Sequence, residues 1–317
     1  MNGRNSTVLL WAWFVLTCWA ASAVVLACGD PVAEVGSTEV DGSHGEDQTP
    51  KVILSTAVGA IVVEVFPDAA PNTLARWLRL VEGTGLESIA KPKADDVRPG
   101  GYYDGLAFSY TKPHVEIVTA SRFPENEGPQ FETELDARSL GLDRDVIESY
   151  AEAMRVLQWE LIRAHGKMGK GKDRPALLVE WIDLWRETGS AGFLIGVARQ
   201  RINEAQGYVY RDGLRSQPVT AGAVALKPLS PTQASARLSI ALADMPQRTG
   251  KWMVIGRVVE GFEVAEKISI RTLKGQGTPE VKRFEPLEPV VITGIEIRPE
   301  AMHEEAPLPE AKQPSPE

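Results

Sequence analysis

The order of periodic segments along the chain constrains its fold more than any other feature. Residues 51–67, KVILSTAVGAIVVEVFP, form two β-rich runs separated at residues 57–59, which is typical of a hairpin. The next segment, PNTLARWLRLVEG, has the apolar spacing of an amphipathic helix, and Asn72 or Thr73 is its expected N-cap. The chain therefore opens with strand, strand and helix.

The middle of the chain changes from strand-like to helical periodicity. In residues 143–166 the apolar side chains follow spacings of three and four, and similar stripes recur in residues 175–189 and 193–207. From residue 221 onward β-rich runs resume. This order predicts one β domain over residues 51–298 with a helical insertion at about 143–206. Two uses of the inserted stripes, which carry Trp159, Trp181 and Trp185, remain open: packing within the domain, or a partner interface.

The first 28 residues have the composition of an export signal. Arg4 precedes an uncharged apolar run that ends in VVLAC, so small Ala27 stands directly before Cys28. This ending resembles the lipobox of bacterial lipoproteins, in which the cysteine sulfur receives a lipid. The sequence therefore predicts a lipoprotein signal peptide over residues 1–28, with lipidation at Cys28. The alternative is an uncleaved membrane anchor, because about 20 apolar residues can span a bilayer.

Two terminal segments and the overall charge exclude several classes of function. Residues 29–50 and 299–317 are acidic and rich in Gly, Ser and Pro, so they are predicted to be a disordered tether and tail. The net charge of −9 argues against a nucleic-acid partner. The histidines are scattered, so no metal site is expected. The turn GKMGKGKD has Asp173 where a phosphate loop needs Ser or Thr, and we expect no cofactor.

Three ordered motifs carry a resemblance to a known family. They are TAVGAIVVEVFPDAAPNTLARWLRLVEG, then GYYDGLAF, then GKWMVIGRVVEGFEV. Together they resemble the cyclophilin-type peptidyl-prolyl cis-trans isomerases. The resemblance implies a mostly β fold: a closed eight-stranded antiparallel β-barrel capped by helices, here with the inserted helical segment. It also implies a proline-binding groove on the outer face of the barrel.

The same resemblance shows which groove positions have changed. Tyr110 stands where the family has its catalytic arginine, so no catalytic residue is assigned with assurance. Val115 and Glu116 replace pocket residues of the family, Val118 replaces a groove glutamine, and Ser239 replaces a second pocket aromatic. The complete set of groove-binding candidates is Phe108, Tyr110, Val115, Glu116, Val118, Arg237, Ser239 and Trp252.

These substitutions favour a protein that binds over one that catalyses. A pocket that contains a carboxylate and a hydroxyl has lost much of its apolar lining, and a tyrosine offers one neutral donor in place of a charged fork. We therefore expect an exported binding or scaffold protein of the bacterial cell envelope, facing the periplasm and attached to the membrane by the lipid. Its expected partner is an exported protein or peptide, or a subunit of an envelope complex. The alternative is an active isomerase or chaperone for exported proteins.

Overall fold

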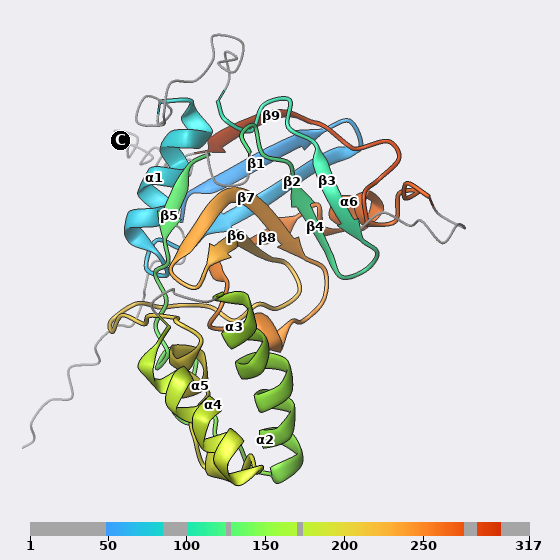
Figure 1. Ribbon diagram of the computed structural model, residues 1–317. Helices are drawn as coiled ribbons and strands as arrows, with labels where there is room; N and C mark the ends of the chain where they lie inside the picture. Colours follow the sequence, from blue (N-terminus) through green and yellow to red (C-terminus); the bar gives the residue numbers. More distant parts are fainter. Residues whose placement is uncertain (1–48, 85–100, 125–127, 170–173, 276–283, 299–317) are drawn as a thin grey trace, which may run out of the picture. The chain divides into compact units, whose positions relative to one another are not determined.

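The strands of the protein form one antiparallel sheet of nine strands among the residues that the structure describes. The hydrogen-bonded order is β3-β4-β7-β6-β8-β2-β1-β9, and β5 pairs with β7 beside this path (Figure 1). The predicted hairpin is present, because Thr56 pairs with Gly59 between β1 and β2. The strands are β1 Lys51–Thr56, β2 Gly59–Val65, β3 Phe108–Lys112, β4 Glu116–Thr119, β5 Gln130–Glu132, β6 Ala223–Ser230, β7 Gln233–Ala241, β8 Met253–Glu260 and β9 Ile292–Arg298.

The sheet curls into a half-barrel and its strand path is open, so the expectation of a closed eight-stranded barrel is wrong. In the part of the chain that the structure describes, β3 and β9 are not neighbours in the sheet, and one isolated bridge, between Ala107 and Val291, joins the residues just before each of them. Beside it, the N–H of Phe108 donates to the carbonyl of Val290 at 2.9 Å. Continuing this register would place Pro289 and Pro286 opposite β3. Only Pro286, opposite Lys112, would fall at a position where the ladder needs an N–H, which proline lacks. The N–H of Thr111 instead donates to the carbonyl of Phe284 at 2.8 Å, so the chain has already left this register.

The main core lies between the curled sheet and two helices, α1 (Pro71–Glu82) and α6 (Phe262–Ser269). Trp77 of α1 donates from Nε1 to the hydroxyl of Tyr103 at 2.7 Å, and that hydroxyl donates to the carbonyl of Ala236 at 2.6 Å. Both aromatic side chains are buried. This chain of hydrogen bonds satisfies the polar atoms of two large core residues and ties α1 to β7.

The start of α1 differs from the prediction that Asn72 or Thr73 caps the helix. The helix begins at Pro71, whose missing N–H costs nothing at this position, and no side chain of the helix itself acts as the cap. The carboxylate of Glu134 takes that role. It accepts the N–H of Thr73 at 2.9 Å and the side-chain amide of Asn72 at 2.6 Å. A residue far away in the sequence therefore holds the helix start.

Helices also occupy the middle of the chain, where they surround a second hydrophobic cluster (Figure 1). The long helix predicted for residues 143–166 begins only at Tyr150 and changes to π-helix in the middle. In α2, Ala153 and Val156 are buried, while Tyr150, the first residue of the helix, is half exposed. The segments are α2 Tyr150–Val156, η3 Leu157–Leu161, α3 Ile162–Lys167, α4 Ala176–Thr188, η4 Gly192–Leu194 and α5 Arg199–Ala205.

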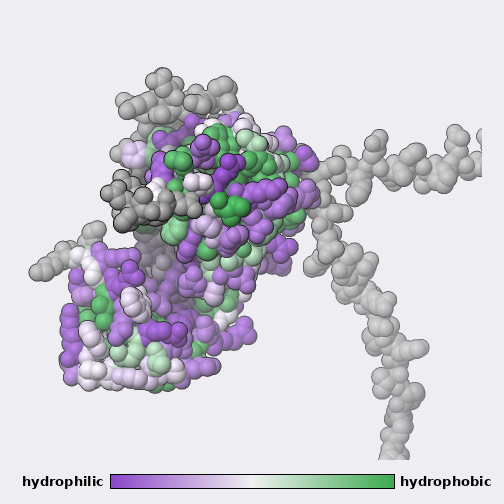
Figure 2. All heavy atoms as spheres, turned by 90° about the vertical axis from the view of Figure 1, so that its right-hand side faces the viewer, coloured by the Kyte–Doolittle hydropathy of each residue, from purple (hydrophilic) through white to green (hydrophobic). Residues whose placement is uncertain are grey.

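The three tryptophans of this helical region differ in how far they are buried. Trp181 is buried and Trp185 is partly buried in the second cluster, so both serve packing. Trp159 lies in the π-helical turn η3 and is 63% exposed. On the face drawn in Figure 2, hydrophobic residues are interspersed among hydrophilic ones. Packing therefore accounts for two of these side chains and leaves Trp159 without a structural role.

The structure is a computed structural model that describes residues 49–84, 101–124, 128–169, 174–275 and 284–298. These residues belong to a unit that spans Gly45–Glu317. The predicted signal peptide with Cys28, nearly all of the predicted tether, and the predicted tail lie outside the described residues. Within the described ranges, the helices are too short or too polar to cross a membrane.

Candidate functional site

Strand register brings the central groove candidates into one row across three neighbouring strands. Tyr110 of β3 pairs with Val118 of β4, and Val118 pairs with Ser239 of β7. Directly paired residues place their side chains on the same face of a sheet, and so do residues two apart in one strand. Glu116 therefore lies on this face beside Val118, and Arg237 lies on it beside Ser239. Five of the candidates, Tyr110, Glu116, Val118, Arg237 and Ser239, therefore share one face of the sheet.

A buried ion pair fills the centre of this face. Glu116 is only 3% exposed. The two terminal nitrogens of the Arg248 guanidinium donate to its two carboxylate oxygens, at 2.5 and 2.7 Å. Ser239 donates from its hydroxyl to the same carboxylate at 3.2 Å. Both oxygens of Glu116 are thus occupied by charge-assisted hydrogen bonds. Glu116 and Ser239, the two polar residues in the expected pocket, therefore form hydrogen bonds with each other, and Glu116 also pairs with Arg248.

Arg248 reaches the carboxylate from outside the strands of the sheet. It ends the short helix η5 (Pro246–Arg248), in the loop between β7 and β8. Its guanidinium carbon lies 4.2 Å from the centre of the Trp252 ring, in cation–π geometry. The planar cation is therefore fixed on one side by Glu116 and on its face by Trp252. This bracing holds the ion pair in place.

A small apolar cluster lies beside the ion pair and takes up the remaining groove candidates. Val115 and Trp252 are partly buried and pack against it. Val118 is itself buried on the face. The cluster consists of Val219, Ala223, Ala225, Ala241, Met245 and Val254. Its apolar surface is already covered by the chain's own side chains.

Tyr110 occupies the edge of this face, half buried. Its ring meets Phe284 edge-on at 5.6 Å between centroids. Burial raises the pKa of the Tyr110 hydroxyl, and the Glu116 carboxylate raises it further while Arg248 opposes the rise. The hydroxyl therefore keeps its proton at neutral pH. It can donate one neutral hydrogen bond, but it supplies no positive charge.

Two further candidates are placed apart from the ion pair. Phe108 is fully buried, and its side chain belongs to the main core on the inner side of the sheet. Arg237 donates from Nε to the carbonyl of Thr119 at 2.8 Å and lines a cavity of about 280 Å³ with Ser109 and Ser121. This polar hollow is the part of the face that stays open.

Sequence reasoning missed Arg248, which decides the chemistry of the site. A signal for it was present, because a carboxylate inside the strand segment EIVT requires a cation or a proton once it is buried. The partner lies 132 residues further along the chain. Among the described residues, no cluster of histidine and carboxylate side chains could hold a metal ion. The arrangement offers a blocked pocket, a neutral tyrosine donor and a small polar hollow.

Comparison with known proteins places these observations in a family context. The family model for cyclophilin type peptidyl-prolyl cis-trans isomerases matches residues 51–297. No curated protein matches the chain. A solved cyclophilin type isomerase of Cryptosporidium parvum is 13% identical, covers 79% of this chain and 98% of its own, and gives a TM-score of 0.41. The structure of that isomerase in the presence of the dipeptide Ala-Pro is 14% identical in sequence, covers 78% of this chain and 98% of its own, and gives a TM-score of 0.40.

Proposed function

The chain belongs to the cyclophilin-type peptidyl-prolyl cis-trans isomerase family, and we propose that it is a member that binds without catalysing isomerisation. The observation that carries the proposal is the buried Glu116–Arg248 pair in the groove. Isomerisation must cross a barrier of about 18 to 20 kcal/mol set by amide resonance. An enzyme lowers it by holding the proline ring in an apolar pocket and directing a fixed donor at the twisted amide.

The ion pair obstructs both requirements. A proline ring could enter only if Arg248 left Glu116, and breaking a buried pair of this kind costs about 3 to 5 kcal/mol. The guanidinium itself is held by Glu116 and Trp252, so it is not directed at a substrate amide. Tyr110 supplies only the neutral donor described above. These contacts support a domain in which the family groove has become part of the packed structure.

The wider proposal concerns where the domain acts. We place it in the bacterial cell envelope, facing the periplasm, with a lipid on Cys28 as its membrane anchor. The support is the sequence of residues 1–28 and the acidic tether that follows. In that location the domain would bind an exported protein or peptide, or a subunit of an envelope complex. The solved relative crystallised with Ala-Pro is consistent with a peptide as the class of ligand in this family.

The alternative function, an active isomerase, rests on the Tyr110 hydroxyl, which retains its proton next to the groove. The two functions separate in an isomerisation assay on a peptide with an X-Pro bond, using the purified full-length protein and a cyclophilin of established activity as the positive control. We expect the uncatalysed rate from the wild-type protein and from Tyr110→Phe. A rate at the level of the positive control that Tyr110→Phe abolishes would establish the alternative.

A gain-of-function series tests the reason for the inactivity. Tyr110→Arg alone is expected to remain inactive, because the pocket is still filled by Glu116 and Arg248. Combining it with Glu116→Met, Arg248→Met and Ser239→Phe would remove both charges and restore apolar lining, so this fourfold variant is the one expected to gain a measurable rate. Activity in Tyr110→Arg alone would show that the ion pair does not block the groove.

A further inference from the structure

One short turn connects the groove to the inserted helices. It spans residues 246–251, between β7 and β8, and it carries Arg248, which pairs with Glu116 in the groove. On its other side the turn contacts the helical arm, by which we mean residues 142–210. The buried residues of the second hydrophobic cluster all belong to this arm, so the arm is packed around a core of its own. A contact by which the arm holds the turn therefore also positions Arg248.

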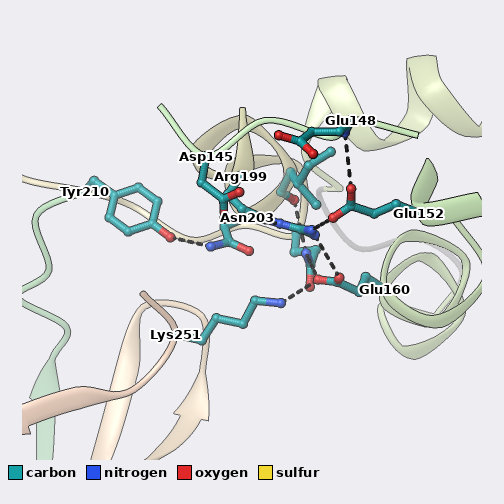
Figure 3. Close-up of polar contacts among 10 residues, drawn as sticks. Asp145, Glu148, Glu152, Glu160, Arg199, Asn203, Tyr210 and Lys251 are labelled. Carbon is teal, nitrogen blue, oxygen red and sulfur yellow. Dashed lines mark hydrogen bonds and ion pairs between the residues drawn. The ribbon is translucent and has the colours of Figure 1, made fainter. Parts of the chain in front are cut away.

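An ion pair makes the first connection between the arm and the turn (Figure 3). Lys251 of the turn donates from Nζ to the Glu160 carboxylate at 2.6 Å, and the two side chains are 18% and 27% exposed. The carboxylate is also held from within the arm, because the Arg199 guanidinium lies 3.5 Å from it and the Gln206 amide donates to it at 3.2 Å. Glu160 is therefore a fixed anchor for Lys251, and such networks contribute more than isolated exposed pairs.

A short chain of hydrogen bonds makes the second connection, one residue before the ion pair (Figure 3). The Tyr210 hydroxyl donates to the Gly250 carbonyl at 2.8 Å and accepts from Asn203 Nδ2, also at 2.8 Å. Gly250 has a φ of +74°, and a Cβ at this position would lie 2.3 Å from Leu142 Cδ1. Both the positive φ and the close approach require glycine. The arm therefore contacts the backbone of the turn as well as one of its side chains.

Backbone hydrogen bonds fix Arg248 relative to these two connections. The Arg248 carbonyl accepts the N–H of Lys251 at 2.9 Å and the N–H of Trp252 at 3.0 Å. The N–H of Arg248 donates to the Met245 carbonyl at 2.9 Å. Because these bonds close the backbone on both sides of Arg248, a displacement of Gly250 and Lys251 is passed on to it. Networks of this kind carry energetic coupling between separate sites.

The contact that Arg248 makes in the groove depends on its exact placement. Its two terminal nitrogens donate to the two oxygens of Glu116, while its guanidinium carbon lies 4.2 Å from the centre of the Trp252 ring. A forked pair stacked on an aromatic ring must keep the in-plane hydrogen bonds and the ring contact together. A turn that moves away from the sheet therefore weakens the pair.

We propose that the helical arm is an autoinhibitory element, which holds the turn, through Glu160 and Tyr210, in the position where Arg248 closes the groove. Glu160 and Tyr210 are positioning residues, because their polar contacts go to the arm and the turn. The inference rests on the proposed function, in which the Glu116–Arg248 pair closes the groove. It gives the insertion a role: a partner that draws the arm off the turn releases Arg248 and makes the groove accessible.

The test measures the strength of the groove ion pair with and without the arm contacts. In the full-length protein, a double-mutant cycle of Glu116→Met and Arg248→Met gives their coupling as a factor in the unfolding equilibrium constant, measured by urea unfolding. We expect a factor of about 30 or more in the wild-type protein, and one about tenfold smaller when the cycle is repeated in Glu160→Gln/Tyr210→Phe. Lys251→Met releases the turn from its own side and should also reduce the factor.

A matched control and a spectroscopic signal separate positioning from a general loss of stability. Glu152 pairs with Arg199 in the same network, but its contacts within the described ranges stay in the arm, so Glu152→Gln should leave the coupling unchanged. Fluorine NMR of protein labelled with 5-fluorotryptophan reports on the Trp252 ring, whose signal Trp252→Phe identifies. In the arm variants this signal should move towards its position in Arg248→Met, while that of Trp77 in the main core stays in place.

Three outcomes would overturn the proposal. If the coupling factor stays near its wild-type value in both arm variants, Arg248 is placed without the arm, whereas the closed groove and the proposed function still stand. If the factor is below about twofold in the wild-type protein itself, the groove is not closed by the pair, and the proposed function fails together with this inference. If Glu152→Gln lowers the factor as much as Glu160→Gln/Tyr210→Phe, the effect is a general one of charge.

Discussion

Removing Arg248 should reveal how strongly the groove depends on its ion pair. In Arg248→Met the Glu116 carboxylate, whose side chain is 4% exposed, keeps only the Ser239 hydroxyl at 3.2 Å. Two charge-assisted hydrogen bonds of about 1.5 to 3 kcal/mol each are lost. Because Arg248 is itself 23% exposed, water can partly replace it, and we expect the lower part of that range, about 3 kcal/mol, as the loss in free energy of unfolding.

The matched control removes both charges. Glu116→Met/Arg248→Met fills the same space with apolar side chains and leaves no buried charge, so its cost should be below about 1 kcal/mol. The double-mutant cycle should then give a coupling energy of about 2 to 3 kcal/mol. Urea unfolding at pH 7, followed by tryptophan fluorescence, measures all the variants. Additive effects, or a loss under about 0.5 kcal/mol for Arg248→Met, would show that the pair does not hold the groove closed.

Three further outcomes are expected. Glu134→Ala should lower the free energy of unfolding by about 1 to 2 kcal/mol in urea titrations, because the start of α1 loses its cap, and an unchanged midpoint would contradict this. Burial and Arg174 hold the pKa of His165 below its usual value, so the stability it contributes is present above pH 6.5 and is lost as pH falls through the lowered pKa; this acid-side loss should be absent in His165→Gln. Cys28→Ser should release the protein from the membrane fraction and remove a lipid from its mass spectrum, whereas retention would favour an uncleaved anchor.

The strand and helix order could be predicted because it depends on local pattern. Alternating apolar runs and the turn at residues 57–59 predicted the first hairpin, and ordered motifs such as GYYDGLAF predicted the family. Barrel closure could not be predicted in the same way. It depends on how the segment opposite β3 pairs, and Pro286 falls at a position where the ladder needs an N–H only once the register is known.

The chemistry of the site was predictable at the level of positions but not of contacts. Register does bring Tyr110, Val118 and Ser239 into one row, as the motif alignment implied. The ion pair of Glu116 could not be predicted, because its partner Arg248 belongs to a turn far away in the sequence. A helical spacing of three and four likewise gave no sign of the π turn, in which the exposed Trp159 lies.

The central claim is that the groove no longer holds and isomerises proline, and exchange spectroscopy on a substrate tests it most directly. A peptide containing Ala-Pro is observed by two-dimensional exchange NMR while wild-type protein is added in increasing amounts. The uncatalysed exchange takes tens to hundreds of seconds at 25 °C, so the cis and trans signals should show no exchange cross-peaks at any protein concentration. Cross-peaks that grow with protein concentration and vanish in Tyr110→Phe would contradict the account.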